Sequence, residues 1–458
     1  MMTLNSLEFL IFFTAVFAVY GIIPGKFRCF WLLIASYTFA FYGSPDFGIT
    51  LAALTMISWA YGKQPRRDPG ITAAAIIFCL LPLCVSKYMR FLLSTLRFPI
   101  HIPEIVVPLG ISFFTFQAIS YIMDIFRGKI PPEEDLVNYA LFMAYFPKLI
   151  SGPIEKPKEL FGQLRELPAY RVWDEDRIRD GILMIFWGLF QKIVIAERAA
   201  MFVNAVYGSF ESYGFLEIFS ASLLYTLEIY LDFNGYTFMA RGISRILGIE
   251  LRSNFRQPYF AASIRDFWHR WHISLTSWFT EYLYIPLGGS RKGSLRKALN
   301  TLIVFCVSGL WHGANWNFIA WGFIHGVFEV LGTWIRSKRN PLTILRTFLL
   351  VNFAWIFFAA GGLKRALRIL TRMTQTLSSG TLPETFRLPG FLLPLCGGLL
   401  IVWIVDMLHE KGFSVFALIR SKPLPFRWCV YIFLIWGVIM MGIYGIGYDS
   451  SGFIYAQF

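Results

Sequence analysis

The fold of this chain is decided by a long stretch without a fixed charge, ALNTLIVFCVSGLWHGANWNFIAWGFIHGVF, which runs from Ala298 to Phe328. A helix needs roughly 20 apolar residues to cross the hydrocarbon core of a bilayer, so the stretch predicts membrane-embedded helices. Two histidines, His312 and His325, lie inside it. An imidazole in hydrocarbon costs free energy unless it is neutral, hydrogen-bonded or in a wet cavity. The stretch therefore also raises the question of what these two side chains do.

The composition extends the membrane interpretation to the whole chain. Of its 458 residues, 56% are hydrophobic and only 15% are charged, whereas soluble domains carry about 25% charged residues. Long apolar runs recur from end to end: Leu7–Ile23, Cys29–Tyr42, Phe47–Tyr61, Ile71–Val85, Ile105–Ile125, Leu136–Phe146, Ile182–Ala196, Phe215–Leu231, Leu299–Trp311, Trp316–Ile335, Leu342–Ala360, Phe391–Met407 and Trp428–Tyr448. We predict an all-α polytopic membrane protein with about ten to thirteen transmembrane or re-entrant helices.

We expect a single integral-membrane domain, because no stretch is long and polar enough for a separate soluble one. The domain divides into N-terminal spans (1–104), a motif-bearing core (105–330) and C-terminal spans (331–458). The N-terminal sequence MMTLNSLEFLIFF has no basic residue before its apolar run and no small-residue cleavage site. We therefore expect a retained first span rather than a removable signal peptide.

The charges and cysteines exclude several other classes of protein. The net charge is +14, from 42 Lys plus Arg against 28 Asp plus Glu. The basic residues are scattered between apolar segments, which is typical of cytoplasmic loops facing anionic lipid and argues against a nucleic-acid partner. The six cysteines lie in or beside apolar runs without a C-x-x-C pair. They predict neither a disulfide framework nor a metal cage.

Two polar regions interrupt the apolar pattern. The first, Pro147–Asp180, mixes both signs of charge with several prolines, and it predicts a loop with short helices at the membrane surface. The second, Arg241–Lys297, is strongly basic, and the positive-inside bias places most of it on the cytoplasmic side.

The second region contains SIRDFWHRWHISLTSWF (Ser263–Phe279), which predicts a helix. Ser263 and Asp266 form a capping-box-like start, and Asp266 and Arg270 are spaced to pair at i,i+4. A basic and aromatic helix of this kind suits the interface or a re-entrant position. One continuous helix would bring together, through i+3 and i+4 spacing, Trp268, Trp271, His272, Leu275 and Phe279.

Common catalytic signatures are missing from the sequence. It has no G-x-S-x-G elbow, no Walker-type phosphate loop and no G-x-G-x-x-G fingerprint. His269 and His272 lie at i,i+3, but no further ligand is suitably spaced nearby, so we expect no metal. Lone histidines remain as acid–base groups, because imidazole titrates near neutrality.

His312 is the strongest of these candidates, and its neighbours favour a function. The alternative is a core histidine bonded to a backbone carbonyl. In WHGANW, however, Gly313 permits close backbone approach, while Asn315 and two indoles supply polar groups that would line a cavity. His325 is expected to be structural.

These residues also carry a resemblance to a known family. SGLWHGANWNFIAWGFIHG (Ser308–Gly326) and SIRDFWHRWHISLTSWFTEYLYIPLGGSRKG (Ser263–Gly293) resemble signature motifs of the membrane-bound O-acyltransferases. YFPKLISGPIEKPKEL (Tyr145–Leu160) and EIYLDFNGYTFMARGISRILGIEL (Glu228–Leu251) agree, in the same order along the chain. Within the family, IPLGGSRKG is similar to the branch that holds the alginate O-acetylation membrane subunit and its peptidoglycan-acetylating relatives. The D-alanyl teichoic acid transferases form a neighbouring branch.

The resemblance implies helices around a tunnel through the membrane, with His312 as the catalytic histidine and His272 as a second histidine supporting activity from the same tunnel. Three residues depart from the family pattern. His269 replaces a usual arginine, Asn234 replaces a serine, and Phe238 replaces a common aspartate. The last change weakens the alginate-type assignment but leaves His312 untouched.

The reaction implied is acyl transfer from a cytoplasmic thioester, with acetyl-CoA as donor and no tightly bound cofactor. His312 would act as general base on a hydroxyl of a cell-envelope or exported polysaccharide, alginate-like or peptidoglycan, or on a relay nucleophile in a periplasmic partner protein. The basic residues around Gly288–Gly289 either receive the phosphates of coenzyme A or form an ordinary cytoplasmic turn; they are Arg291, Lys292, Arg296 and Lys297.

Further polar and aromatic side chains complete the expected substrate site. Trp311, Asn315 or a backbone N–H would steady the developing oxyanion. A carboxylate in an apolar region, Asp232, suggests function, although a buried pair with an arginine is the structural alternative. The expected substrate-binding residues are Asp232, Tyr236, Trp268, Arg270, Trp311 and Asn315.

The expected location is the bacterial cytoplasmic (inner) membrane, in contact with lipid, the thioester donor, the polysaccharide and the partner protein. Two alternatives stay open. One is transfer of D-alanyl or another acyl group to a teichoic acid-like polymer. The other is a transporter or flippase of lipid-linked saccharides, which is disfavoured because transporters are often built from inverted repeats and none is visible here.

Overall fold

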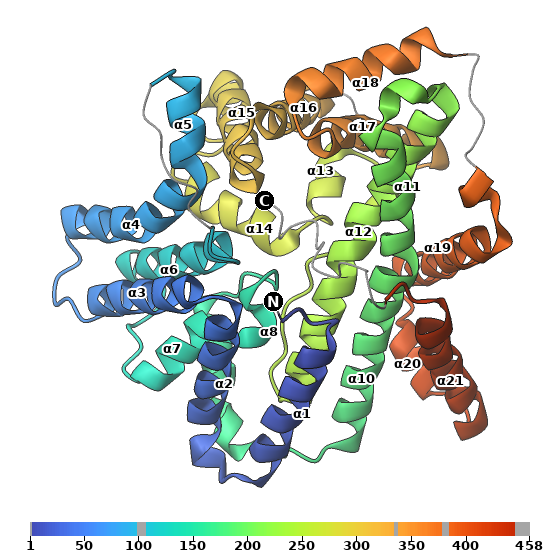
Figure 1. The fold of residues 1–458 in the computed structure, drawn as a ribbon. Helices are drawn as coiled ribbons and strands as arrows, with labels where there is room; N and C mark the ends of the chain where they lie inside the picture. Colours follow the sequence, from blue (N-terminus) through green and yellow to red (C-terminus); the bar gives the residue numbers. More distant parts are fainter. Residues whose placement is uncertain (1, 99–106, 334–337, 378–383, 445–458) are drawn as a thin grey trace. The chain divides into compact units, whose positions relative to one another are not determined.

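The structure, a computed structural model, describes residues 2–98, 107–333, 338–377 and 384–444. Those residues form helices and connecting loops, and no β-strand occurs among them (Figure 1). The prediction of an all-α protein is confirmed.

The chain divides into two compact units. The first comprises the described residues of Met1–Ile182 and Ala240–Arg252, and the second those of Leu183–Met239 and Ser253–Asp449. The long helix α12 (Phe215–Ile246) contributes to both units, as does α10 (Glu175–Leu189).

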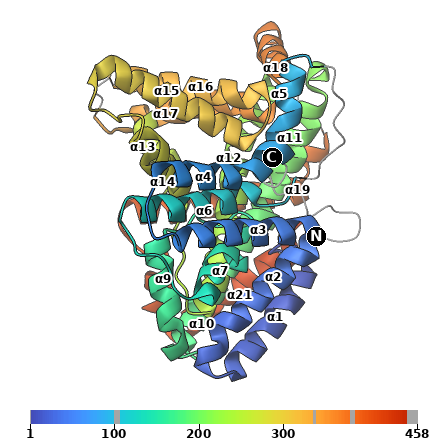
Figure 2. The same cartoon turned by 90° about the vertical axis from the view of Figure 1, so that its left-hand side faces the viewer.

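The first unit consists of short and medium-length helices. The α-helices are α1 (Leu7–Ile22), α2 (Arg28–Gly43), α3 (Pro45–Gly62), α4 (Pro69–Leu83), α5 (Met89–Thr95), α6 (Ile111–Phe126), α7 (Leu136–Ala144), α8 (Phe146–Leu149) and α9 (Pro157–Glu166), joined by η1 (Gly25–Phe27), η2 (Cys84–Tyr88) and η3 (Leu167–Ala169). Helix α3 packs between α2 on one side and α4 and α6 on the other (Figure 2). It starts at Pro45, because the side chain of Ser44 accepts the N–H of Phe47 and a proline is tolerated in a first turn.

The second unit holds the histidine-rich motifs. Besides parts of α10 and α12, it contains η4 (Phe190–Ala196), α11 (Glu197–Gly208), η5 (Phe210–Ser212), η6 (Pro258–Phe260), α13 (Ile264–Trp268), α14 (Ile273–Phe279), η7 (Thr280–Tyr284), α15 (Gly293–His312), α16 (Trp316–Gly332), α17 (Pro341–Ala359), α18 (Leu363–Gln375), η8 (Glu384–Arg387), α19 (Pro389–Glu410), α20 (Val415–Arg420) and α21 (Leu424–Met441).

The uncharged stretch from Ala298 to Phe328 folds as a tight hairpin of α15 and α16, and α17 packs beside α16. Two glycines allow the close approach. A Cβ added to Gly309 would lie 2.1 Å from the carbonyl oxygen of Phe318, and one added to Gly322 would lie 2.1 Å from that of Phe305. Small residues at such crossings let helix backbones meet. The WHGANW segment forms the turn between the two helices.

Four helical segments among the described residues are long and apolar enough to cross a bilayer: Pro69–Leu96, α17, α19 and α21. The shorter α1 and α6 are also apolar. These apolar helices indicate a multi-pass membrane protein, while the total of ten to thirteen segments stays a prediction.

The two polar regions differ in how well they were predicted. Pro147–Asp180 contains the short helices α8, α9 and η3, as predicted. The helix expected from Ser263 to Phe279 is wrong as a continuous element. Ser263 caps its start as predicted, with its hydroxyl accepting the N–H of Asp266, but α13 ends at Trp268 and α14 begins only at Ile273. The reason is the backbone of His272, at φ 42° and ψ 53°, which no right-handed helix accommodates.

Candidate active site in the second unit

His312 is the last residue of α15 and lies among aromatic rings. Its side chain is buried, with 2% of the residue exposed. The ring stands edge-on to Trp311, Trp321 and Phe358, at centroid distances of 4.8, 5.1 and 5.3 Å. Gly313 then turns the chain out of the helix with extended backbone angles. The imidazole is therefore fixed at a helix end by rigid neighbours rather than by flexible aliphatic ones.

His272 lies in the turn between α13 and α14 and contacts the same aromatic cluster. Its ring packs at 4.7 Å from that of Phe233 and at 6.2 Å from that of Trp311. Trp311 thus contacts both His272 and His312, which are far apart in the sequence. His272 and His312, which were expected to act together, therefore belong to one aromatic cluster, in which the indole of Trp311 packs against both rings.

His325 extends this cluster on the other side of Trp321. The ring of Trp321 lies 5.1 Å from each of His312 and His325, and Trp268 lies 5.0 Å from His325. His325 is fully buried, and neither ring nitrogen has a hydrogen-bond partner among the described residues. Trp321 was not singled out from the sequence, although it lies one turn before His325 on α16 and its spacing could have suggested the contact.

A cavity of about 380 Å³ lies next to this cluster. Its walls come from α13, α14, η7, α15 and α16, and the lining residues include the apolar Leu275, Phe279, Val304 and Phe305. Ser308 and Trp268 belong to the lining as well. Ser308 precedes His312 by one turn of α15, and Trp268 touches His325. His312 itself is not among the lining residues.

The rim of the cavity carries charge. Arg265, His269, Lys297 and Glu329 all contribute to its lining, and Arg265 forms a 2.8 Å ion pair with Glu329. Of the basic residues predicted around Gly288–Gly289, only Lys297 is part of this lining, while Arg291, Lys292 and Arg296 are exposed. Besides the Arg265–Glu329 pair, Lys297 gives the apolar hollow a positive charge, which suits a ligand with a nonpolar part and an anionic part.

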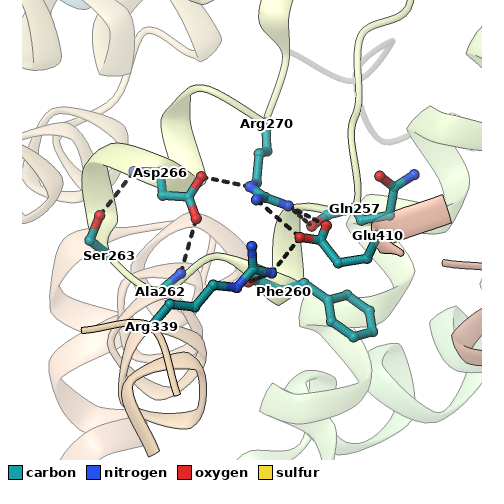
Figure 3. Close-up of polar contacts among 8 residues, drawn as sticks. All are labelled: Gln257, Phe260, Ala262, Ser263, Asp266, Arg270, Arg339 and Glu410. Carbon is teal, nitrogen blue, oxygen red and sulfur yellow. Dashed lines mark hydrogen bonds and ion pairs between the residues drawn. The ribbon is translucent and has the colours of Figure 1, made fainter. Parts of the chain in front are cut away.

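Arg270, expected to bind substrate, has its guanidinium surrounded by carboxylates (Figure 3). It pairs with Asp266 at 2.6 Å, as the i,i+4 spacing predicted, and with Glu410 at the end of α19, also at 2.6 Å. The sequence had not indicated Glu410 as a partner.

Asp232 and Tyr236 lie on α12, one turn apart, and both are buried. Asp232 pairs with Lys192 of η4, which also lies 3.3 Å from Glu197. The structural alternative weighed for Asp232 was a pair with an arginine; the partner is a lysine. Asn315 occupies the N-cap position of α16, where its backbone carbonyl accepts the N–H of Phe318 and its side chain makes no capping bond.

Metal ligands do not gather in the described part of the chain, where no group of three or more His, Cys, Asp or Glu side chains is arranged to hold an ion. The chemistry available in the cluster is that of imidazole, indole and backbone groups.

The sequence is similar to those of known acyltransferases. The profile of the MBOAT, membrane-bound O-acyltransferase, family matches residues 131–363. The chain is 35% identical over 393 residues to a probable alginate O-acetylase of Pseudomonas aeruginosa, covering 81% of this chain and 75% of that protein. It is 37% identical over 302 residues to a peptidoglycan O-acetyltransferase of Helicobacter pylori, covering 59% and 57%. A teichoic acid D-alanyltransferase of Bacillus subtilis is 28% identical over 345 residues, covering 68% and 83%.

Proposed function

Because this chain belongs to the membrane-bound O-acyltransferase family and is an acyltransferase, we propose that it moves an acetyl group from cytoplasmic acetyl-CoA to a hydroxyl of a cell-envelope or exported polysaccharide. His312 is the catalytic base and His272 supports it. The higher identity to the alginate and peptidoglycan O-acetylating relatives supports acetyl over D-alanyl transfer. The bacterial cytoplasmic membrane is the proposed location.

The observation that carries the proposal is the position of His312 at the end of α15. It follows Ser308 of the cavity wall by one helical turn and shares Trp311 with His272. We infer that an acyl group bound in the cavity moves past Ser308 to reach the imidazole, which three aromatic rings hold. Fixed geometry of this kind turns an encounter into a positioned reaction.

The chemical step follows from the imidazole. His312 accepts the proton of the acceptor hydroxyl, while the oxygen of that hydroxyl attacks the carbonyl carbon of the thioester. The tetrahedral intermediate collapses, the carbon–sulfur bond breaks, and the proton passes from the imidazolium to the departing coenzyme A thiolate. The indole N–H of Trp311, the amide of Asn315 or a backbone N–H stabilises the oxyanion. A nucleophile of a periplasmic partner protein takes the place of the sugar hydroxyl where transfer proceeds by relay.

The cavity supports the choice of an acyl-CoA donor. Its apolar lining suits the pantetheine arm and the acyl group, and Lys297 in the same lining suits a phosphate. Arg291, Lys292 and Arg296 precede Lys297 in the sequence and are exposed, so they add positive charge to this segment.

The test is mass analysis of base-released material from envelope glycans of cells carrying His312→Ala. We expect loss of the acetate that wild-type cells release, with membrane insertion unchanged. Val307→Ala, at an exposed position on the same helix, is the matched control and should leave acetylation intact. Acetate at the wild-type level in His312→Ala would refute the catalytic role. Release of alanine instead of acetate from the glycans of wild-type cells, and its loss in His312→Ala, would favour the D-alanyl reaction.

A further inference from the structure

The strongest unassigned feature of the second unit is the contact between the C-terminal end of α19 and the turn that carries His272. It joins Glu410, which lies beyond the residues matched by the family profile, to Arg270, two residues before His272. We propose that Glu410 is a positioning residue: through Arg270 it holds the His272 turn in its left-handed conformation. The inference rests on the role of His272 in the proposed acyl transfer.

The turn needs to be held because its backbone is unfavourable. His272 and Gln257 both have positive φ angles, 42° and 41°, although neither is glycine. The left-handed region brings the Cβ of such residues too close to the backbone. Conformations of this kind persist where the surroundings fix them, and they cluster at functional sites.

Two short segments pair around the turn. The N–H of Arg256 donates to the carbonyl of Arg270 at 3.0 Å, and the N–H of Ile273 donates to the carbonyl of Asn254 at 2.8 Å. The side chain of Asn254 also accepts the hydroxyl of Ser274 at 2.7 Å. These bonds fix the residues on either side of His272, but all of them lie within residues 253–274.

Arg270 connects this local structure to a distant helix (Figure 3). Its Nη1 donates to Oε2 of Glu410 at 2.6 Å and its Nη2 donates to Oε1 at 3.3 Å, while its Nε donates to Asp266. Such two-pronged arginine–carboxylate contacts fix orientation as well as distance. The arginine side chain is 8% exposed and that of Glu410 is 16% exposed, so solvent screens the pair little. Arg339 also binds Glu410 and donates to the carbonyl of Phe260.

Helix α19 is itself fixed to the element that packs against His272. The hydroxyl of Tyr230 on α12 donates to Asp406, one turn before Glu410, at 3.0 Å. Phe233, one turn further along α12, packs against the His272 ring. Helix α12 therefore fixes the position of the end of α19, where Glu410 lies, and also packs against the His272 ring. This double attachment makes Glu410 a positioning group rather than a surface charge.

The experiment compares Glu410→Gln with the wild-type protein in proteoliposomes. They are supplied with radiolabelled acetyl-CoA and with envelope polysaccharide and periplasmic extract from cells lacking the protein, so that a relay partner is present. Glutamine keeps the size of the side chain but loses the charge. We expect kcat to fall between about tenfold and a hundredfold, the range that a small misplacement of a catalytic group produces, while KM for acetyl-CoA stays the same. In a His272→Ala background, Glu410→Gln should lower kcat no further.

Amide hydrogen exchange of the segment 253–280 gives a second readout that does not depend on activity. We expect faster exchange in Glu410→Gln than in the wild-type protein. Glu211→Gln is the matched control, because Glu211 forms an exposed ion pair with Arg368 in the same unit, and it should change neither kcat nor exchange.

The outcomes separate this inference from the function on which it rests. Unchanged exchange in Glu410→Gln, an unchanged kcat, or a further loss of kcat in the His272→Ala background would each overturn the positioning role. Wild-type proteoliposomes that transfer no acetate would refute the proposed function instead, and the exchange experiment would still test the contact.

Discussion

At the scale of single residues, His272 combines a reactive side chain with a costly backbone. Replacement by alanine removes the imidazole but keeps the unfavourable positive φ, whereas replacement by glycine removes both. We expect His272→Gly to be more stable than His272→Ala by about 1 kcal/mol, since the left-handed penalty is of that order, and both variants to keep a reduced but measurable activity. Thermal unfolding in detergent measures the difference. Equal stability of the two variants would contradict this, because it would show that the backbone at position 272 leaves the left-handed region in His272→Ala.

The segment around His272 shows which contacts the spacing of residues along a helix could predict and which it could not. The pair of Asp266 and Arg270 followed directly from i,i+4 spacing, because both lie near one helical turn. The break at His272 did not follow, since helical periodicity assumes that the backbone continues. Its cause is tertiary: the pairing with Asn254 and the contact with Glu410, which is 140 residues from Arg270. A single sequence holds no pattern that connects such distant positions.

At the scale of elements, helix α15 carries both the cavity wall and His312. Ser308 faces the cavity and is 6% exposed. Ser308→Phe would fill the part of the cavity that is nearest to His312 along α15, without altering the imidazole. We expect transfer from acetyl-CoA to fall at least about tenfold, because the carbonyl no longer reaches its attack position. The acetylation assay measures this, and wild-type activity in the variant would mean that the donor takes another route.

The hairpin of α15 and α16 offers a test of why these helices pack so closely. The Cβ of Gly309→Ala would meet the carbonyl oxygen of Phe318 at 2.1 Å, a backbone atom that has no rotamer by which to move aside. We expect destabilisation of about 1–3 kcal/mol, as for overpacked cores. Gly332→Ala on α16 is the control, because nothing lies within 4 Å of its added Cβ. The experiment is thermal unfolding of both variants, and equal stability would contradict the packing argument.

The sequence located these elements well but not their contacts. Predicted apolar runs coincide with helices such as α1, α2, α3, α17 and α19, because an apolar segment in a membrane satisfies its backbone groups by forming a helix. The runs on either side of WHGANW became the two arms of the hairpin. That His312 and His325 share Trp321 could not be read from their separation, since it depends on the chain reversing at Gly313.

At the scale of the whole molecule, the division into two units places all the histidine cluster, the cavity and the Glu410 contact in the second. That unit also contains a buried charge cluster, in which Lys192 pairs with Asp232 and Glu197. Side chains in this cluster are less than one-tenth exposed. Buried ion pairs stabilise little over apolar residues of the same shape, but loss of one partner is severe, because it leaves the opposite charge without compensation.

Lys192→Met should therefore destabilise the protein by about 3–5 kcal/mol. Asp232→Asn should cost less, because Lys192 keeps Glu197 as a partner at 3.3 Å. Arg368→Met is the control for loss of a cation, since its exposed pair with Glu211 is worth at most about 1 kcal/mol. Thermal unfolding gives the order of the three variants. If Asp232→Asn abolished acetylation while remaining folded, the carboxylate would act on substrate in addition to its place in the charge cluster. Substrate binding is the role that the sequence suggested for Asp232.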